Sequence, residues 1–159
     1  MFFFGILHLI KEHFEFLTTH LCYVLVLVGI DAELDELSVD DVSQTEDRIV
    51  SQWREVSADE RHQLCDGVNE LLRPLGFETS LLVIRRANSL ALYFICMTLA
   101  ALTSLRDQWE SEQLKDIVQK LFTLLSRATQ TVRVKRLTWP MNDYQRCLNF
   151  FSSARGWQT

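Results

Sequence analysis

The longest run of apolar residues extends from Ser89 to Leu105, seventeen residues without a charge, a proline or a glycine. A membrane-spanning helix needs about 20 consecutive apolar residues. This run is shorter, and Thr98, Thr103 and Ser104 interrupt it with polar groups. A helix that is apolar all round is also typical of the centre of a helical protein. The pattern therefore favours a buried central helix and leaves a membrane span as the alternative.

Hydrophobic residues recur at helical spacing through most of the remaining chain. Ser57 and Glu60 have the spacing of a capping box, which would begin a helix at that point. The chain contains only five Gly and two Pro, as expected for helices joined by short connections. Residues 128–138 fit a loop, a short strand or a frayed turn. We expect helices over residues 39–56, 57–73, 79–105, 111–127 and 141–153.

Residues 1–30 are strongly apolar. Phe14, Leu17 and Leu21 have helical spacing, whereas the run from Tyr23 to Val28 is rich in β-branched residues and is ambiguous towards strand. A secretory signal would place basic residues before its apolar core, and this chain has none there. We therefore expect one or two packing helices, with a cleaved signal or a membrane anchor as the alternative.

A weak internal repeat guides the choice of fold. Residues 60–75 and 110–125 are identical at seven of sixteen positions. Helix pairs that repeat with a period of forty to fifty residues are typical of HEAT and armadillo solenoids. We expect an all-α fold in which antiparallel helices stack as an α-solenoid, with a closed helical bundle as the second choice. A single domain would then cover residues 1–159, with apolar N-terminal helices at 1–30, an acidic connector at 31–47 and a helical core at 48–156.

Charge is distributed unevenly around a mild net value of -5. Residues 31–47 contain eight acidic residues and neither Lys nor Arg. Such a segment is usually a solvated connector with an acidic helix start. The alternative is a docking surface for a basic partner, or for the chain's own basic stretch near residues 127–136.

Motifs for catalysis and cofactor binding are missing from the sequence. There is no G-x-S-x-G turn, no glycine-rich phosphate loop and no H-E-x-x-H zinc motif. The four cysteines lie far apart and form no C-x-x-C pair, a pattern that fits reduced thiols in the cytoplasm or nucleus. We therefore expect an intracellular protein with no catalytic residue, no cofactor site and no metal site.

Recognition of a partner is the function that the sequence favours. A basic strip beside Trp139 could bind an acidic protein or grip phosphates, and Trp157 beyond the last helix is a candidate surface anchor. We expect a non-enzymatic scaffold or adaptor that binds a protein partner, forms part of a larger complex or a homo-oligomer, and favours an acidic partner. The alternatives are nucleic-acid association through residues 127–136 and membrane association through residues 1–30. The candidate partner-binding residues are Arg127, Arg133, Lys135, Arg136, Trp139 and Trp157.

Overall fold

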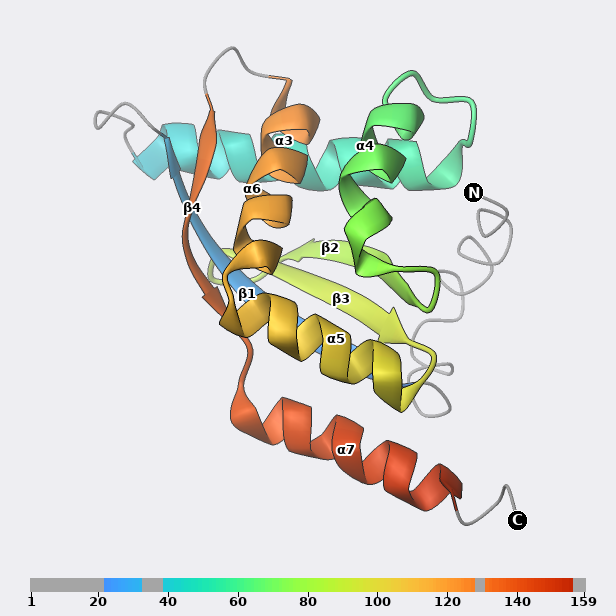
Figure 1. Cartoon of the computed structure of the whole chain (residues 1–159). Helices are drawn as coiled ribbons and strands as arrows, with labels where there is room; N and C mark the ends of the chain where they lie inside the picture. Colours follow the sequence, from blue (N-terminus) through green and yellow to red (C-terminus); the bar gives the residue numbers. More distant parts are fainter. Residues whose placement is uncertain (1–21, 33–38, 128–130, 156–159) are drawn as a thin grey trace.

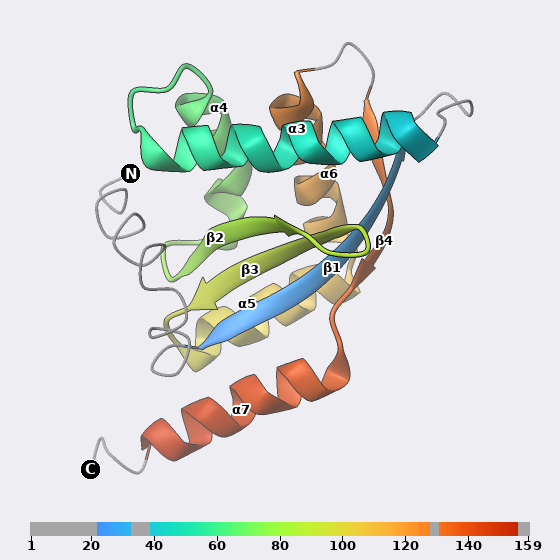
Figure 2. The same ribbon diagram turned by 180° about the vertical axis from the view of Figure 1, so that it is seen from behind.

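The computed structural model describes residues 22–32, 39–127 and 131–155, and these form a mixed α/β structure (Figure 1). The elements follow one another as β1 (Tyr23–Ala32), α3 (Val39–Ala58), α4 (Cys65–Leu72), the 3-10 turn η1 (Arg73–Leu75), β2 (Thr79–Arg86), β3 (Leu90–Cys96), α5 (Leu99–Glu110), α6 (Gln113–Ser126), β4 (Val132–Thr138) and α7 (Met141–Arg155). Helices α4, α5 and α6 lie on one side of the four-stranded sheet (Figures 1 and 2). Helix α3 runs along the sheet beyond β2, and α7 lies beside β1 at the end of the molecule away from α3.

The strands are ordered β2-β3-β1-β4 in the sheet, and every neighbouring pair is antiparallel. Helical segments connect β1 to β2 and β3 to β4, whereas β2 and β3 form a hairpin. This β-α-β-β-α-β order, with β3 inserted between β1 and β2, is the split β-α-β or ferredoxin-like topology. Strands β3 and β1 are therefore the two central strands, and β2 and β4 form the edges.

The structure contradicts the expected all-α fold, both as an α-solenoid and as a bundle. The apolar run from Ser89 to Leu105 is not one helix: it contains β3, a turn and the first half of α5. Six of the seven β3 side chains are buried, so the strand shows no polar alternation. An apolar run buried on both faces can form either a strand or a helix, because periodicity does not separate the two. The helix expected over residues 79–105 was wrong for the same reason.

The capping box and the internal repeat were also misread. Ser57 lies inside α3, where its hydroxyl donates to the carbonyl oxygen of Trp53 at 2.6 Å. Helix α4 begins only at Cys65, and the two segments of the proposed repeat form a short helix with a 3-10 turn in one case and α6 in the other. No helical repeat, of HEAT or armadillo type, is therefore present in the described residues. The helices expected near residues 39–56, 111–127 and 141–153 are confirmed as α3, α6 and α7.

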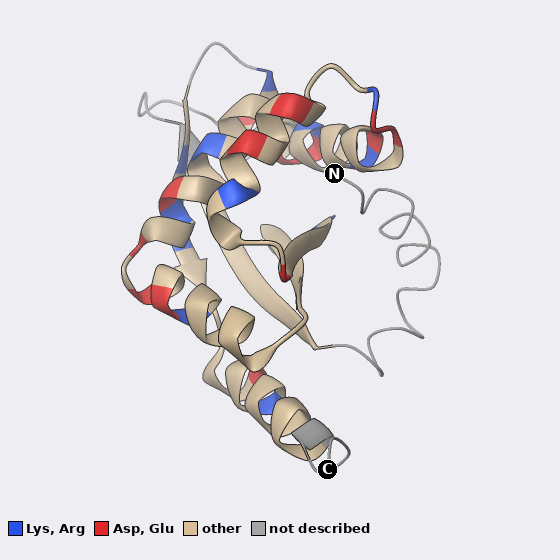
Figure 3. Cartoon of the chain, turned by 45° about the vertical axis from the view of Figure 1, so that its right-hand side comes forward, with Lys and Arg blue, Asp and Glu red and all other residues tan. Residues whose placement is uncertain are grey.

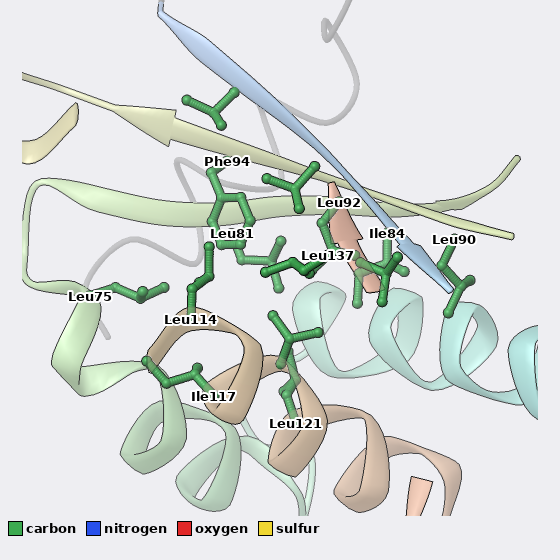
Figure 4. Packing of buried hydrophobic residues seen from close by; sticks show 14 of the residues in the cluster. Leu75, Leu81, Ile84, Leu90, Leu92, Phe94, Leu114, Ile117, Leu121 and Leu137 are labelled. Carbon is green, nitrogen blue, oxygen red and sulfur yellow. The ribbon is translucent and has the colours of Figure 1, made fainter. Parts of the chain in front are cut away.

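One face of the sheet and the helices that pack on it form the hydrophobic core. Val24, Val26 and Val28 of β1 are fully buried and pair with β3 residues, among them Leu92 and Phe94, which are also buried. Figure 4 shows side chains of α6 beneath the strands that carry these residues. Burying a Val, Leu or Phe side chain stabilises a fold by about 1.5–3 kcal/mol. Because successive strand residues point to opposite faces, the β1 residues between these valines project to the other face.

Within the described ranges, no helix combines the length and apolarity needed to cross a bilayer.

Two glycines, one with a positive φ and one without, allow a matched test of backbone strain. Gly76 has φ 88° and ψ 172° and precedes β2, whereas Gly29 lies in β1 without a positive φ; an added Cβ meets no atom within 4 Å at either position. This region of φ and ψ is essentially restricted to glycine. We expect Gly76→Ala to lower the free energy of unfolding by about 1–2 kcal/mol, and Gly29→Ala to change it by less than about 0.5 kcal/mol. Urea denaturation of both variants tests this, and equal effects would contradict a conformational origin.

Candidate functional site

The face of the sheet turned away from α6 is the candidate functional site (Figure 2). None of the described helices crosses it. Because successive strand residues point to opposite faces, the residues beside the buried core positions lie on this side. We call it the open face and define it by Tyr23, Leu25, Leu27, Val83, Arg85, Tyr93, Arg136 and Thr138; Ala91 and Ile95 of β3 lie on the same side but are buried.

The centre of the open face is apolar. In the sheet register, Leu25 pairs with Tyr93, which in turn pairs with Val83, and Leu27 pairs with Ala91. Leu27 is 37% exposed, whereas Leu25, Val83 and Tyr93 are half-buried. Figure 3 shows the two central strands with almost no charge: β3 has none. The result is a strip of apolar and aromatic side chains that runs along β1 and β3.

Two tyrosines of the open face lie beside cationic side chains. The rings of Tyr23 and Tyr93 are 6.3 Å apart between centroids. The guanidinium of Arg85 lies 5.7 Å from the centroid of Tyr93, and that of Arg146 from α7 lies 3.8 Å from the centroid of Tyr23. These are cation–π distances, and such contacts fix the guanidinium groups over the rings.

Positive charge flanks the apolar strip on both outer strands. Arg85 on β2 lies in the same cross-strand row as Ala91, Leu27 and Thr138, and Arg136 on β4 pairs with Gly29 in the next row. Both arginines are exposed. Since neighbouring strands are about 4.8 Å apart, the outer strands are separated by about 14 Å. The open face therefore combines an apolar centre with a cation on either side.

The edge of β4 is closed by side chains of α6. The amide of Val132 donates to Thr123 Oγ1 at 3.0 Å, and the amide of Val134 donates to Gln119 Oε1 at 3.1 Å. An exposed strand edge is a template for pairing with another strand, and side chains that occupy its amides block such pairing.

The first half of β1 also lies at an edge of the sheet, because β4 pairs only with β1 residues from Leu27 onward. Helix α7 covers this part: Asp143 Oδ2 accepts from the Leu25 amide at 3.1 Å. The carbonyl oxygen of Tyr23 accepts from Arg146 and from Cys147 Sγ. Side chains of α7 thus take the place of strand partners at this edge.

A buried arginine fixes α7 to α5. Arg106 is 7% exposed, and its guanidinium lies 4.4 Å from the ring centroid of Trp109, 5.0 Å from that of Trp139 and 4.5 Å from that of Tyr144. The indole of Trp139 also donates to Asp143 Oδ2 at 3.0 Å. Cation–π contacts are strengthened where water is excluded, so this cluster holds the helix that covers the β1 edge.

The structure brings part of the predicted basic strip to the surface and separates it from its aromatic neighbour. Arg133, Lys135 and Arg136 are exposed on β4, and Arg127 caps α6 with φ 54°. Trp139 is only 3% exposed, so its ring does not lie on the surface beside these cations. Trp157 lies outside the described residues, as do residues 1–21.

The acidic segment contacts cations of the same chain. Glu46 lies 3.3 Å and Asp47 2.8 Å from the guanidinium of Arg86 at the end of β2. The backbone of Asp31 pairs with that of Arg133 in the sheet. This is a pairing of main chains, so docking of the acidic segment on the basic stretch at residues 127–136 stays a prediction.

All four cysteines are buried, and Cys96 and Cys147 have the properties of inert thiols. Burial raises the pKa of Cys96 to about 12. The pKa of Cys147 is also raised, chiefly by a hydrogen bond with Cys22 and then by burial. A thiol must ionise to act as a nucleophile, so these groups stay protonated at neutral pH. Among the described residues, no group of three or more His, Cys, Asp or Glu side chains is arranged to hold a metal ion.

Sequence reasoning identified Arg136 but missed the apolar centre of the open face. One signal was present: Val24, Val26 and Val28 alternate with larger residues, as expected for a strand with one tightly packed face. Both faces of β1 are apolar, however, so the alternation did not show which one is covered. No family model, no curated protein and no solved structure matches this chain. The function therefore has to be inferred from the geometry of the chain itself.

Proposed function

We propose that this protein is a non-enzymatic interaction module, acting as a scaffold or adaptor, that binds another protein through the open face of its sheet. One observation carries the proposal: Leu25, Leu27 and Tyr93 form an apolar strip that no described helix crosses, between Arg85 and Arg136 on the outer strands. Exposed apolar surface rimmed by polar residues is typical of protein-interaction sites. Tyrosine and arginine are also enriched in such interfaces.

The chemistry of the thiols supports a binding role over a catalytic one. A nucleophilic cysteine needs a lowered pKa and access to a substrate. Here the pKa values of Cys65, Cys96 and Cys147 are raised, for Cys65 and Cys96 chiefly by burial. All three side chains are also buried. These groups are better explained as apolar parts of the core.

The aromatic rings are already covered by other groups of the chain, and this favours a protein partner over nucleic acid. Single-stranded nucleic acids stack their bases on aromatic faces. One face of Tyr23 is occupied by the guanidinium of Arg146 at 3.8 Å, and Arg85 lies over Tyr93. Trp139 is buried. The net charge of -5 also disfavours a polyanion.

Site-specific crosslinking tests the proposal. A photoreactive amino acid replaces Leu27 in one form of the full chain and Met97 in another; Met97 is 61% exposed in the loop between β3 and α5. In cells that express each form, we expect a defined protein to be crosslinked from position 27 and not from position 97. The purified pair should then bind with 1:1 stoichiometry in calorimetry.

Matched substitutions complete the test. We expect Leu27→Glu to weaken binding of the purified partner at least tenfold, because a carboxylate would be desolvated in an apolar contact. Met97→Glu should leave the affinity unchanged and controls for the loss of an exposed apolar side chain. Equal recovery from both crosslinking positions, or unchanged affinity of Leu27→Glu, would refute the proposal. Binding of a single-stranded oligonucleotide that Leu27→Glu abolishes would replace it with the nucleic-acid alternative.

A further inference from the structure

We propose that the chain's own N-terminal segment, residues 1–21, covers the open face with an amphipathic helix, and that a partner has to displace it. This segment lies outside the described residues. The cover is argued from side chains buried on the open face, from the place where the segment joins the sheet, and from the pattern of its apolar residues. The competition with a partner rests on the proposed function, whereas the cover itself does not.

Three apolar side chains are buried without belonging to the hydrophobic core. Ala91 is 4% and Ile95 5% exposed, and Leu82, at the bulge opposite Tyr93, is 1% exposed. Every other buried apolar side chain of the described residues is part of the core cluster. Ala91 and Ile95 lie on the side of the sheet that no described helix crosses. Tyr93 and Arg85 on the same side also take part in further interactions. These side chains therefore indicate a second apolar layer over the open face.

The central strands have the composition of strands that are covered on both sides. An antiparallel sheet with one face in water usually alternates apolar and polar residues, whereas strands buried on both faces are apolar throughout. Apart from the tyrosine hydroxyls, no polar side chain occurs in β1 from Tyr23 to Val28 or in β3 from Leu90 to Cys96. Large uncovered apolar patches are rare on soluble proteins. A layer on the open face is therefore expected in addition to the core.

The N-terminal segment joins the sheet beside this face. The carbonyl oxygen of Cys22, the first described residue, accepts from the Cys96 amide at 3.1 Å. The chain that precedes Cys22 therefore begins next to Met97, at the end of β3. From there Leu25, at the centre of the apolar strip, is only about 10 Å away along β1. A short covalent connection gives a segment an effective concentration of the order of mM, which favours this occupant over a second copy of the chain.

The segment has the pattern and the length of a covering helix. Its apolar residues recur at alternating spacings of four and three, and its charged residues and His8 lie on the other side: the stripe is Phe3, Leu7, Ile10, Phe14 and Leu17, and the polar side is His8, Lys11, Glu12 and Glu15. A helix over residues 3–17 would be about 22 Å long, and β3 extends over about 23 Å. Residues 18–21 remain as the connection to β1, and connections of about 2–6 residues are usual.

Crosslinking within the purified full chain tests the cover. A photoreactive amino acid replaces Leu27 on the open face in one form and Lys120 in another; Lys120 is 61% exposed on α6, on the other side of the sheet. Mass spectrometry maps the products, and a mixture of ¹⁴N and ¹⁵N chains separates crosslinks within one chain from crosslinks between two. We expect position 27 to crosslink to residues 1–21 of the same chain with a yield about tenfold above that of position 120.

Matched substitutions in the segment test the displacement. Leu7→Gln/Phe14→Gln places two amides in the apolar contact, where burial without hydrogen bonds is unfavourable. We expect the crosslink from position 27 to fall about fivefold, and the affinity for the purified partner to rise about fivefold, because a covered site binds only in the fraction of molecules that is open. The control His8→Gln/Glu15→Gln changes two positions with the same spacing on the polar side. It should alter neither quantity by more than about twofold.

The outcomes separate the cover from the proposed function. Equal yields from positions 27 and 120, or no crosslink from position 27 to residues 1–21, would overturn the cover. Crosslinks between two chains instead would overturn it by identifying a second copy as the occupant. An unchanged partner affinity of Leu7→Gln/Phe14→Gln would overturn the displacement. Crosslinks within the chain together with no partner captured in cells would support the cover and refute the proposed function.

Discussion

Replacing Asp143 by Ala is expected to lower the free energy of unfolding by about 3 kcal/mol. The carboxylate is only 10% exposed and serves three donors: the Leu25 amide, the Trp139 indole and the guanidinium of Arg146, at 3.1, 3.0 and 2.8 Å. A buried donor left without an acceptor costs about 1–3 kcal/mol. Since the Leu25 amide belongs to β1, loss of its acceptor also weakens the cover of the strand edge by α7.

Urea denaturation measures the loss in the free energy of unfolding. Hydrogen exchange of the Leu25 amide reports on the exposure of the β1 edge. We expect this amide to exchange at least tenfold faster in Asp143→Ala. Asp116→Ala is the matched control, because Asp116 pairs with Lys120 at 2.9 Å but both side chains are more than half exposed. Exposed pairs of this kind contribute about 0.5 kcal/mol or less. A loss for Asp143→Ala no larger than that of the control would show that α7 is held by apolar packing alone.

Removal of Arg86 is expected to destabilise the protein by about 3 kcal/mol at pH 7, and by much less at pH 4. The Glu46 side chain is 7% exposed and lies 3.3 Å from Arg86, which also contacts Asp47 and the carbonyl oxygen of Ser43. Truncating one partner of a buried ion pair costs about 3–5 kcal/mol, since a buried charge is left without compensation. We expect the lower end because the Arg86 side chain is 35% exposed.

The pH dependence follows from the carboxyl group of Glu46. Its pKa is raised, chiefly by burial, and Arg86 is the influence that lowers it. A raised pKa means that the folded state holds the proton more tightly than the unfolded state, so ionisation of Glu46 disfavours the fold as the pH rises between the two pKa values. Without Arg86 the folded-state pKa moves further up. The deficit of Arg86→Ala should therefore grow from acid towards neutral pH.

Denaturation at pH 4 and pH 7 tests this dependence. Arg73→Ala is the control: Arg73 pairs with Glu70 at 2.9 Å, but the side chains are 75% and 66% exposed. We expect it to change stability by less than about 0.5 kcal/mol at both pH values. Adding Glu46→Gln to Arg86→Ala should recover most of the loss at pH 7. A deficit that is the same at both pH values would show that Arg86 acts through packing.

The sequence predicted the elements that have one apolar and one polar face. Helix α6 has a stripe that includes Leu114, Leu121 and Leu125 opposite charged residues, and such a stripe is evident without knowledge of its neighbours. The basic residues of β4 were equally visible, because Arg133 and Arg136 are exposed wherever the strand packs. Local signals of this kind depend on the residue and its nearest neighbours along the chain.

The sequence by itself determined where the helices α3, α6 and α7 form and that cations gather near residue 133. Tertiary structure decided that the apolar runs of β1 and β3 are strands, which faces of those strands are covered, and that Arg85 lies opposite Arg136. The physical reason is that a run apolar on both faces carries no period of its own. Its conformation is set by pairing between residues far apart in the chain, and that pairing alone brings an apolar strip and two cations onto one surface.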